Sequence, residues 1–199
     1  MIKIASKNLH TKNSGFTILE LLVCIAIFAF MTAFLIAKYG TFNQSVLLTN
    51  LAYDTAITIR SAQTFGLGVL GSSASAASQN FAYSYGVHFD LEHPQTFSML
   101  FYDPSTYDTI GTNSVYTMKP QYQITSLCVG SGPDDCPLSP AVTFLDILFV
   151  RPNPDAIIIP NENTSISTLP SYAEVVFTAI DGSTKKIIVR STGEVAVSN

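Results

Sequence analysis

One long run of apolar residues dominates the first part of the chain. Residues 16–37 read FTILELLVCIAIFAFMTAFLIA, and a single charge, Glu20, interrupts them. Spanning a bilayer takes about 20 apolar helical residues, whereas the apolar region of a cleaved secretory signal has roughly 7–15. The run therefore predicts a membrane-spanning helix over residues 16–37 rather than an ordinary cleaved signal peptide.

Beyond the run, the pattern changes to a single apolar stripe at helical spacing. Polar residues fall on one face between positions 43 and 61, and the opposite face carries Leu48, Ala52, Ala56 and Ile59. Such a stripe is typical of an amphipathic helix that packs on a core. We therefore predict one helix over residues 16–65, about 75 Å long at 1.5 Å per residue.

After a small polar loop at residues 71–80, the hydrophobic period changes to two, which indicates strands. Asp181-Gly182 between two apolar runs predicts a hairpin. The chain thus reads as a leader at 1–15, the helix at 16–65 and a β-rich domain at 66–199. The expected class is α+β, a long N-terminal helix followed by an antiparallel domain of two packed sheets. The expected strands are 81–89, 96–102, 115–118, 122–128, 142–150, 156–159, 172–180, 185–190 and 194–197.

Charge is unevenly distributed along the chain. The leader, residues 1–15, contains Lys3, Lys7 and Lys12 and no acidic residue. The rest of the chain contains the other 7 of the ten basic residues and all 14 acidic residues, which gives it a net charge of −7. Basic residues before a membrane helix favour a cytoplasmic N-terminus in the inner membrane, with the body across it. An acidic body argues against nucleic acid as a partner.

Glu20 belongs to a recognisable pattern. A basic leader ends at Gly15, Phe16 follows, and a glutamate stands at the fifth position after the glycine, inside the apolar run. This resembles the type IV prepilin signature. The resemblance implies that prepilin peptidase cuts between Gly15 and Phe16 and methylates the new amino terminus of Phe16.

The resemblance also implies a role for Glu20 in assembly. A carboxylate in hydrocarbon is costly and usually has a partner. The amine of Phe16 is the natural one, in the same chain or in the next pilin subunit, because paired ions partly offset their desolvation. Contact with membrane lipid and with other pilin or pseudopilin subunits is therefore expected.

The body resembles the H-type minor pseudopilins of type II secretion and type IV pilus systems. Many major pilins have a proline where this chain has Ala37, which argues against a major subunit. The implied function is a structural minor pilin or pseudopilin; the alternative is a tip or adhesive subunit that recognises a surface, DNA or a secreted protein. The segments that carry the similarity are 60–63, 85–90, 186–190 and 193–195.

No catalytic or metal-binding motif is apparent, so we expect no enzyme activity, no cofactor and no metal. His88 is expected on a solvated strand face. Residues Asp103 to Asp108 could form an eroded calcium loop, but calcium sites usually have more oxygen-bearing side chains and a glycine at the bend, and the sequence leaves this open. Cys128 and Cys136 enclose VGSGPDD and would bridge in an oxidising compartment, whereas Cys24 is expected to be a small buried apolar residue.

Overall fold

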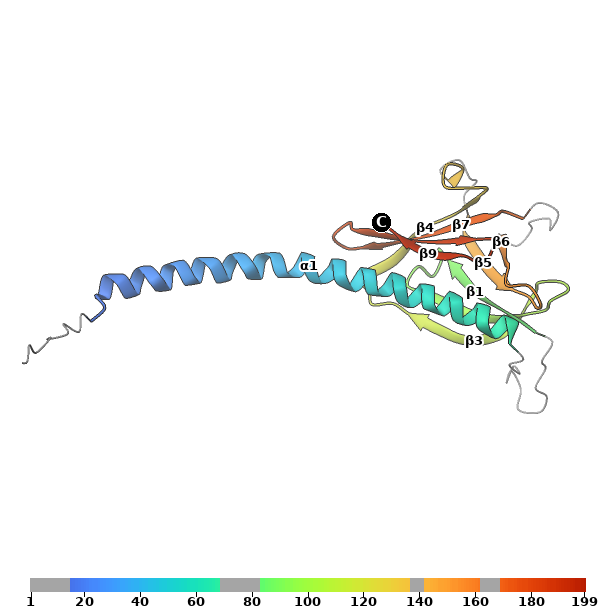
Figure 1. Cartoon of the computed structure of the whole chain (residues 1–199), viewed down its shortest axis with the longest axis horizontal. Helices are drawn as coiled ribbons and strands as arrows, with labels where there is room; N and C mark the ends of the chain where they lie inside the picture. Colours follow the sequence, from blue (N-terminus) through green and yellow to red (C-terminus); the bar gives the residue numbers. More distant parts are fainter. Residues whose placement is uncertain (1–14, 69–82, 137–141, 162–168) are drawn as a thin grey trace, which may run out of the picture. The chain divides into compact units, whose positions relative to one another are not determined.

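The computed structural model describes residues 15–68, 83–136, 142–161 and 169–199, without the side chains of 38–42. It divides into two compact units, Met1–Phe42 and Asn43–Asn199. Helix α1 (Ile18–Leu67) contributes residues to both units (Figure 1). The helix starts two residues later than the sequence predicts, since Thr17 caps its first turn, and it also ends two residues later, at Leu67.

Among the described residues of the second unit, nine strands follow the helix and form two antiparallel sheets (Figure 1). The α+β class with two sheets is confirmed. The five-stranded sheet has the order β3-β2-β1-β5-β6, from β1 (Ser84–Asp90), β2 (Thr96–Tyr102), β3 (Thr109–Thr117), β5 (Phe144–Phe149) and β6 (Ala156–Pro160). The four-stranded sheet has the order β4-β7-β8-β9, from β4 (Tyr122–Gly130), β7 (Tyr172–Ala179), β8 (Thr184–Arg190) and β9 (Val195–Ser198).

Strand β3 is where the prediction from sequence was most incomplete. The predicted strand covered residues 115–118, but β3 spans Thr109–Thr117. Most of its side chains are exposed, so it lacks the alternation of apolar and polar residues that marks a half-buried strand. At the start of β1, residues 81 and 82 of the predicted strand lie outside the described residues.

Two turns in the four-stranded sheet share one design. In each, a glycine with φ of 82° donates its N–H to the residue three positions earlier: Gly182 to Ala179 and Gly193 to Arg190, both at 2.9 Å. The carbonyl of the residue after each glycine accepts the N–H of the residue that begins the turn, Ala179 or Arg190, and so closes the hairpin. This is a type I turn followed by a bulge residue in the left-handed region, which glycine adopts without steric cost.

One hydrophobic core joins the second part of α1 with both sheets. Leu48, Ala52 and Ile59 supply the helix stripe and are at most 1% exposed. Across the five-stranded sheet, the rings of Phe89 and Phe97 stack at 5.6 Å between centroids, and those of Phe97 and Tyr116 at 5.0 Å. This aromatic row crosses β1, β2 and β3 and ends at the outermost strand.

Candidate functional site: the start of the N-terminal helix

The first turn of α1 is closed by a reciprocal cap between Thr17 and Glu20. The backbone N–H of Glu20 donates to Thr17 Oγ1 at 3.2 Å, and the backbone N–H of Thr17 donates to Glu20 Oε2 at 3.3 Å. The Thr17 hydroxyl also donates to Glu20 Oε2 at 3.3 Å. Thr-x-x-Glu in this geometry is a capping box, which satisfies two backbone donors that a helix start leaves unpaired.

The capping box gives Glu20 a partner within its own chain, which we did not derive from the sequence. The signal was present in Thr17-Ile18-Leu19-Glu20, which matches the pattern of a capping box directly before an apolar run. Glu20 can therefore be bonded locally before any new amine exists at Phe16.

The peptide bond between Gly15 and Phe16 lies just outside the helix. Residues 15–17 have no helical or strand structure, and the side chain of Phe16 is 83% exposed. An added Cβ at Gly15 would meet nothing within 4 Å. Among the described residues the bond thus lies outside secondary structure and is not packed, as suits a peptidase substrate.

The following helical segment, Ile18–Ala37, carries one charge, Glu20, and is otherwise predominantly apolar on every face. Its mean hydropathy is 2.6 and none of it is buried within the protein. Large side chains such as Phe30 and Leu35 are 76% and 67% exposed. A helix this apolar has to bury its surface in lipid or against other helices. Cys24 is exposed here as well, so the expected burial of its side chain does not occur among the described residues.

The two other cysteines lie in the second unit and are bonded to each other. Cys128 belongs to β4 and Cys136 ends the turn that follows, with their Cα atoms 5.4 Å apart. The hydroxyl and the N–H of Ser131 both bond to the carboxylate of Asp135 inside this loop. Asp135 thus organises the loop that the disulfide closes.

His88 is not the solvated residue that the sequence suggested. It is half-buried, and its Nδ1 lies 2.6 Å from Asp146 Oδ1, which also accepts a hydrogen bond from the buried Tyr102 hydroxyl at 2.9 Å. Burial by itself lowers the pKa of His88, but the hydrogen bond and charge of Asp146, with the charge of Asp90, raise it above its ordinary value. The expectation failed because β1 and β5 place His88 directly opposite Asp146, 58 residues away.

Two other acidic side chains, Asp90 and Asp103, bond within their own turns. Asp103 Oδ1 accepts the N–H groups of Ser105 and Thr106 at 2.8 and 3.3 Å. Asp90 bonds His93 Nδ1 and the N–H of Glu92, both at 2.8 Å. These are side-chain caps of turns.

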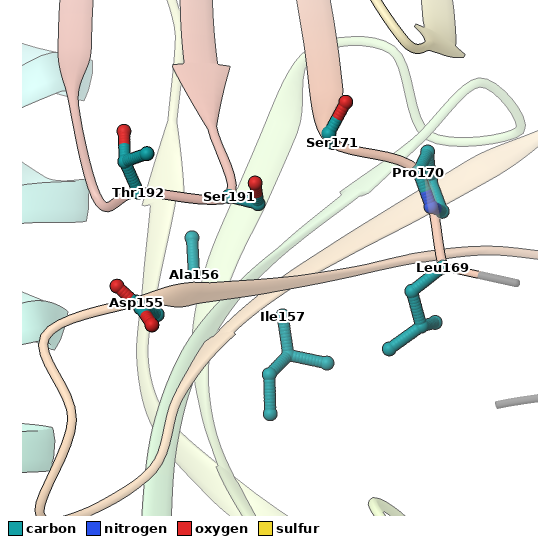
Figure 2. Close-up of a pocket in the computed structure, with 8 residues that line it drawn as sticks. All are labelled: Asp155, Ala156, Ile157, Leu169, Pro170, Ser171, Ser191 and Thr192. Atoms are coloured by element: carbon teal, nitrogen blue, oxygen red, sulfur yellow. The ribbon is translucent and has the colours of Figure 1, made fainter. Parts of the chain in front are cut away.

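A shallow pocket of about 280 Å³ lies where the start of β6 meets the start of β7 and the β8–β9 turn (Figure 2). Its polar side chains are the carboxylate of Asp155 and the hydroxyls of Ser171, Ser191 and Thr192. Neither histidine nor cysteine is among the described residues that line it.

The fold and the capped apolar helix together define an α+β protein with an N-terminal segment suited to anchoring in a membrane. Residues 10–36 match the family model described as the prokaryotic N-terminal methylation motif. The matched residues include Gly15, Phe16 and Glu20, and with the apolar helix they fit a type IV pilin-like protein. No curated protein and no solved structure matched the chain.

Proposed function

We propose that the chain is a minor pilin or pseudopilin of the H type, a structural subunit of a type IV pilus or a type II secretion pseudopilus. The observation that supports this most is the methylation motif over residues 10–36, directly ahead of and within an apolar helical segment that is not buried among the described residues. The motif implies processing by prepilin peptidase and assembly with other pilins. Its family is structural, and we propose a role without enzymatic activity.

Cleavage between Gly15 and Phe16 would change the electrostatics of the helix start. It would create an ammonium group on Phe16, one residue before the Thr17 cap and four before Glu20. The Glu20 carboxylate could then exchange the weak, exposed Thr17 bonds for an ion pair with this amine or with that of a neighbour. Exchange is easy here because the cap bonds are long, at 3.2–3.3 Å.

We further propose that the subunit starts in the inner membrane with a cytoplasmic N-terminus. Three leader lysines precede the span, and only Lys38 follows it closely, which favours this orientation. The β domain would then lie outside the cytoplasm, where the Cys128–Cys136 bridge is stable. Its net charge of −7 makes nucleic acid an unfavourable partner.

The test is N-terminal mass analysis of the chain isolated from its host, with and without the peptidase. We expect the mature chain to begin at Phe16 and to carry one added methyl group. Gly15→Ala should slow processing, and Gly15→Leu should block it because a bulky side chain hinders close approach to the backbone. Ser14→Leu is the matched control one residue earlier. An intact Met1 terminus, or a cut within the apolar run, would refute the assignment.

A further inference from the structure

The free edge of β3 is the least protected strand edge among the described residues. β3 is the outermost strand of the five-stranded sheet, spans nine residues and contains no charged residue. Natural edge strands are usually short, charged or interrupted by proline. The opposite edge, β6, has five residues and ends at Pro160, and β9 has four residues. β4 is also long, but its Ile124 N–H already bonds the carbonyl of Pro94 at 2.7 Å.

The phase of the β2–β3 ladder shows which backbone groups face the free edge. Met118 N–H donates to Gln95 O at 2.8 Å, so this pair is hydrogen-bonded. Hydrogen-bonded and non-hydrogen-bonded pairs alternate along an antiparallel ladder. Tyr116 therefore bonds to β2, opposite Phe97, whereas Val115 and Thr117 direct their N–H and C=O groups away from it.

Irregular pairing limits the usable edge to one end of β3. The register with β2 shifts between Met99 and Leu100 and again between Phe101 and Tyr102, which leaves Asn113 and Ile110 without a partner residue. Bulges of this kind twist an edge and discourage pairing. The regular stretch runs from residue 114 to residue 117, and two of its residues, Val115 and Thr117, direct their N–H and C=O groups outward.

The side chains along this stretch favour an apolar neighbour. Val115 is 62% exposed. Tyr116 is 37% exposed and closes the aromatic row that Phe89 and Phe97 begin on the core face. An added strand would place one of its residues directly opposite Tyr116, where an aromatic or β-branched side chain would extend the row.

We propose that residues 114–117 of β3 receive an extended strand from the globular domain of a neighbouring pilin-type subunit. The partner strand is uncharged and carries an aromatic or β-branched residue opposite Tyr116. This inference rests on the proposed function, because assembly through the N-terminal helix is what brings pilin-type chains side by side. A second copy is disfavoured as the occupant because it would bring a second −7 charge to the same edge, whereas a different subunit need not.

Strand addition differs from side-chain docking in its need for the Val115 N–H. Val115→Pro removes this donor without removing a β2–β3 hydrogen bond, and proline is tolerated at such edge positions. Val115→Thr is the matched control, because it keeps the N–H and the β-branched shape. Val115→Lys is a second disruptive variant, since a charged side chain on an edge strand discourages pairing with an added strand.

The experiment uses the full-length chain in membranes, with a photo-crosslinking amino acid at Thr117. It is co-expressed singly with each other chain of the same organism that carries an N-terminal methylation motif. We expect one partner to crosslink, a yield at least tenfold lower with Val115→Pro or Val115→Lys, and a change of less than twofold with Val115→Thr. Amide hydrogen exchange at Val115 and Thr117 should slow at least tenfold in the complex, while exchange at Tyr116 stays unchanged.

Three results would overturn the proposal. Equal crosslinking of the Val115→Pro and unsubstituted chains would exclude strand addition, and equal loss with Val115→Thr would point to docking of side chains alone. Crosslinking only to a second copy would exclude the proposed occupant. Absence of any crosslink in a chain that is processed at Phe16 and incorporated normally would refute this inference and leave the proposed function intact. A melting temperature within a few degrees of the unsubstituted chain verifies the fold of each variant.

Discussion

Glutamine in place of Glu20 separates the two roles that the structure allows for this carboxylate. Glutamine can still accept the N–H and hydroxyl of Thr17, because capping boxes use Glu or Gln at this position. It carries no charge, so it cannot form an ion pair with an amine on Phe16. The complementary change is Thr17→Ala, which removes the side-chain cap and leaves the carboxylate in place.

The size of the capping effect follows from the geometry. Replacing a capping threonine by alanine costs about 0.5–2 kcal/mol, and the bonds here are exposed and long, at 3.2–3.3 Å. We therefore expect a cost of about 0.5–1 kcal/mol for Thr17→Ala. Even if this were fully coupled to assembly, incorporation would fall by about fivefold at most. We expect a loss of at least tenfold for Glu20→Gln, since the amine would lose its charged partner.

The assay is the fraction of each chain in sheared filaments or in complexes with partner pilins, at equal abundance in the membrane. Thr17→Ser keeps the capping hydroxyl and is therefore the control for any effect of substituting residue 17 that does not come from loss of the cap. Normal incorporation of Glu20→Gln would show that the charge is not needed for assembly. A larger loss with Thr17→Ala than with Glu20→Gln would show that the capping role dominates, contrary to our reasoning.

Three further predictions concern the second unit. The Cys128–Cys136 bridge should contribute roughly 2–3 kcal/mol to stability through loop closure. Non-reducing peptide mapping of the exported chain should recover the two peptides linked by the bridge. Free thiols at both positions would contradict the existence of the bridge. The raised pKa of His88 means that its protonated pairing with Asp146 stabilises the fold fully below about pH 6.5 and is lost as pH rises through the higher folded pKa. The difference in unfolding free energy between the unsubstituted chain and His88→Gln should thus shrink between pH 6 and pH 9, and a pH-independent difference would refute it. Gly193→Ala should lower the free energy of unfolding, measured by chemical denaturation, more than Gly182→Ala does. Both glycines have φ of 82°, but only at Gly193 would an added Cβ clash with a backbone oxygen, that of Pro154. Equal losses of stability in the two variants would mean that the clash is relieved.

The sequence by itself determined the features that depend on near neighbours. The apolar run and Glu20 predicted the membrane segment and the methylation motif, because hydropathy and a short motif need no tertiary context. The same holds for the Thr17–Glu20 cap, because four consecutive residues contain the whole pattern of a capping box. Asp181-Gly182 likewise fixed a hairpin, since the turn closes within five residues.

The tertiary structure decided everything that depends on which strands are neighbours. β3 and β4 follow each other in the chain but belong to different sheets, and β1 is flanked by β2 and by β5. That pairing brings His88 to Asp146, and it leaves β3 at an edge with Val115 exposed. The alternation of side chains tells which residues face a core but not which strand lies beside them. Strand pairing is set by long-range packing and loop closure, which no local pattern encodes.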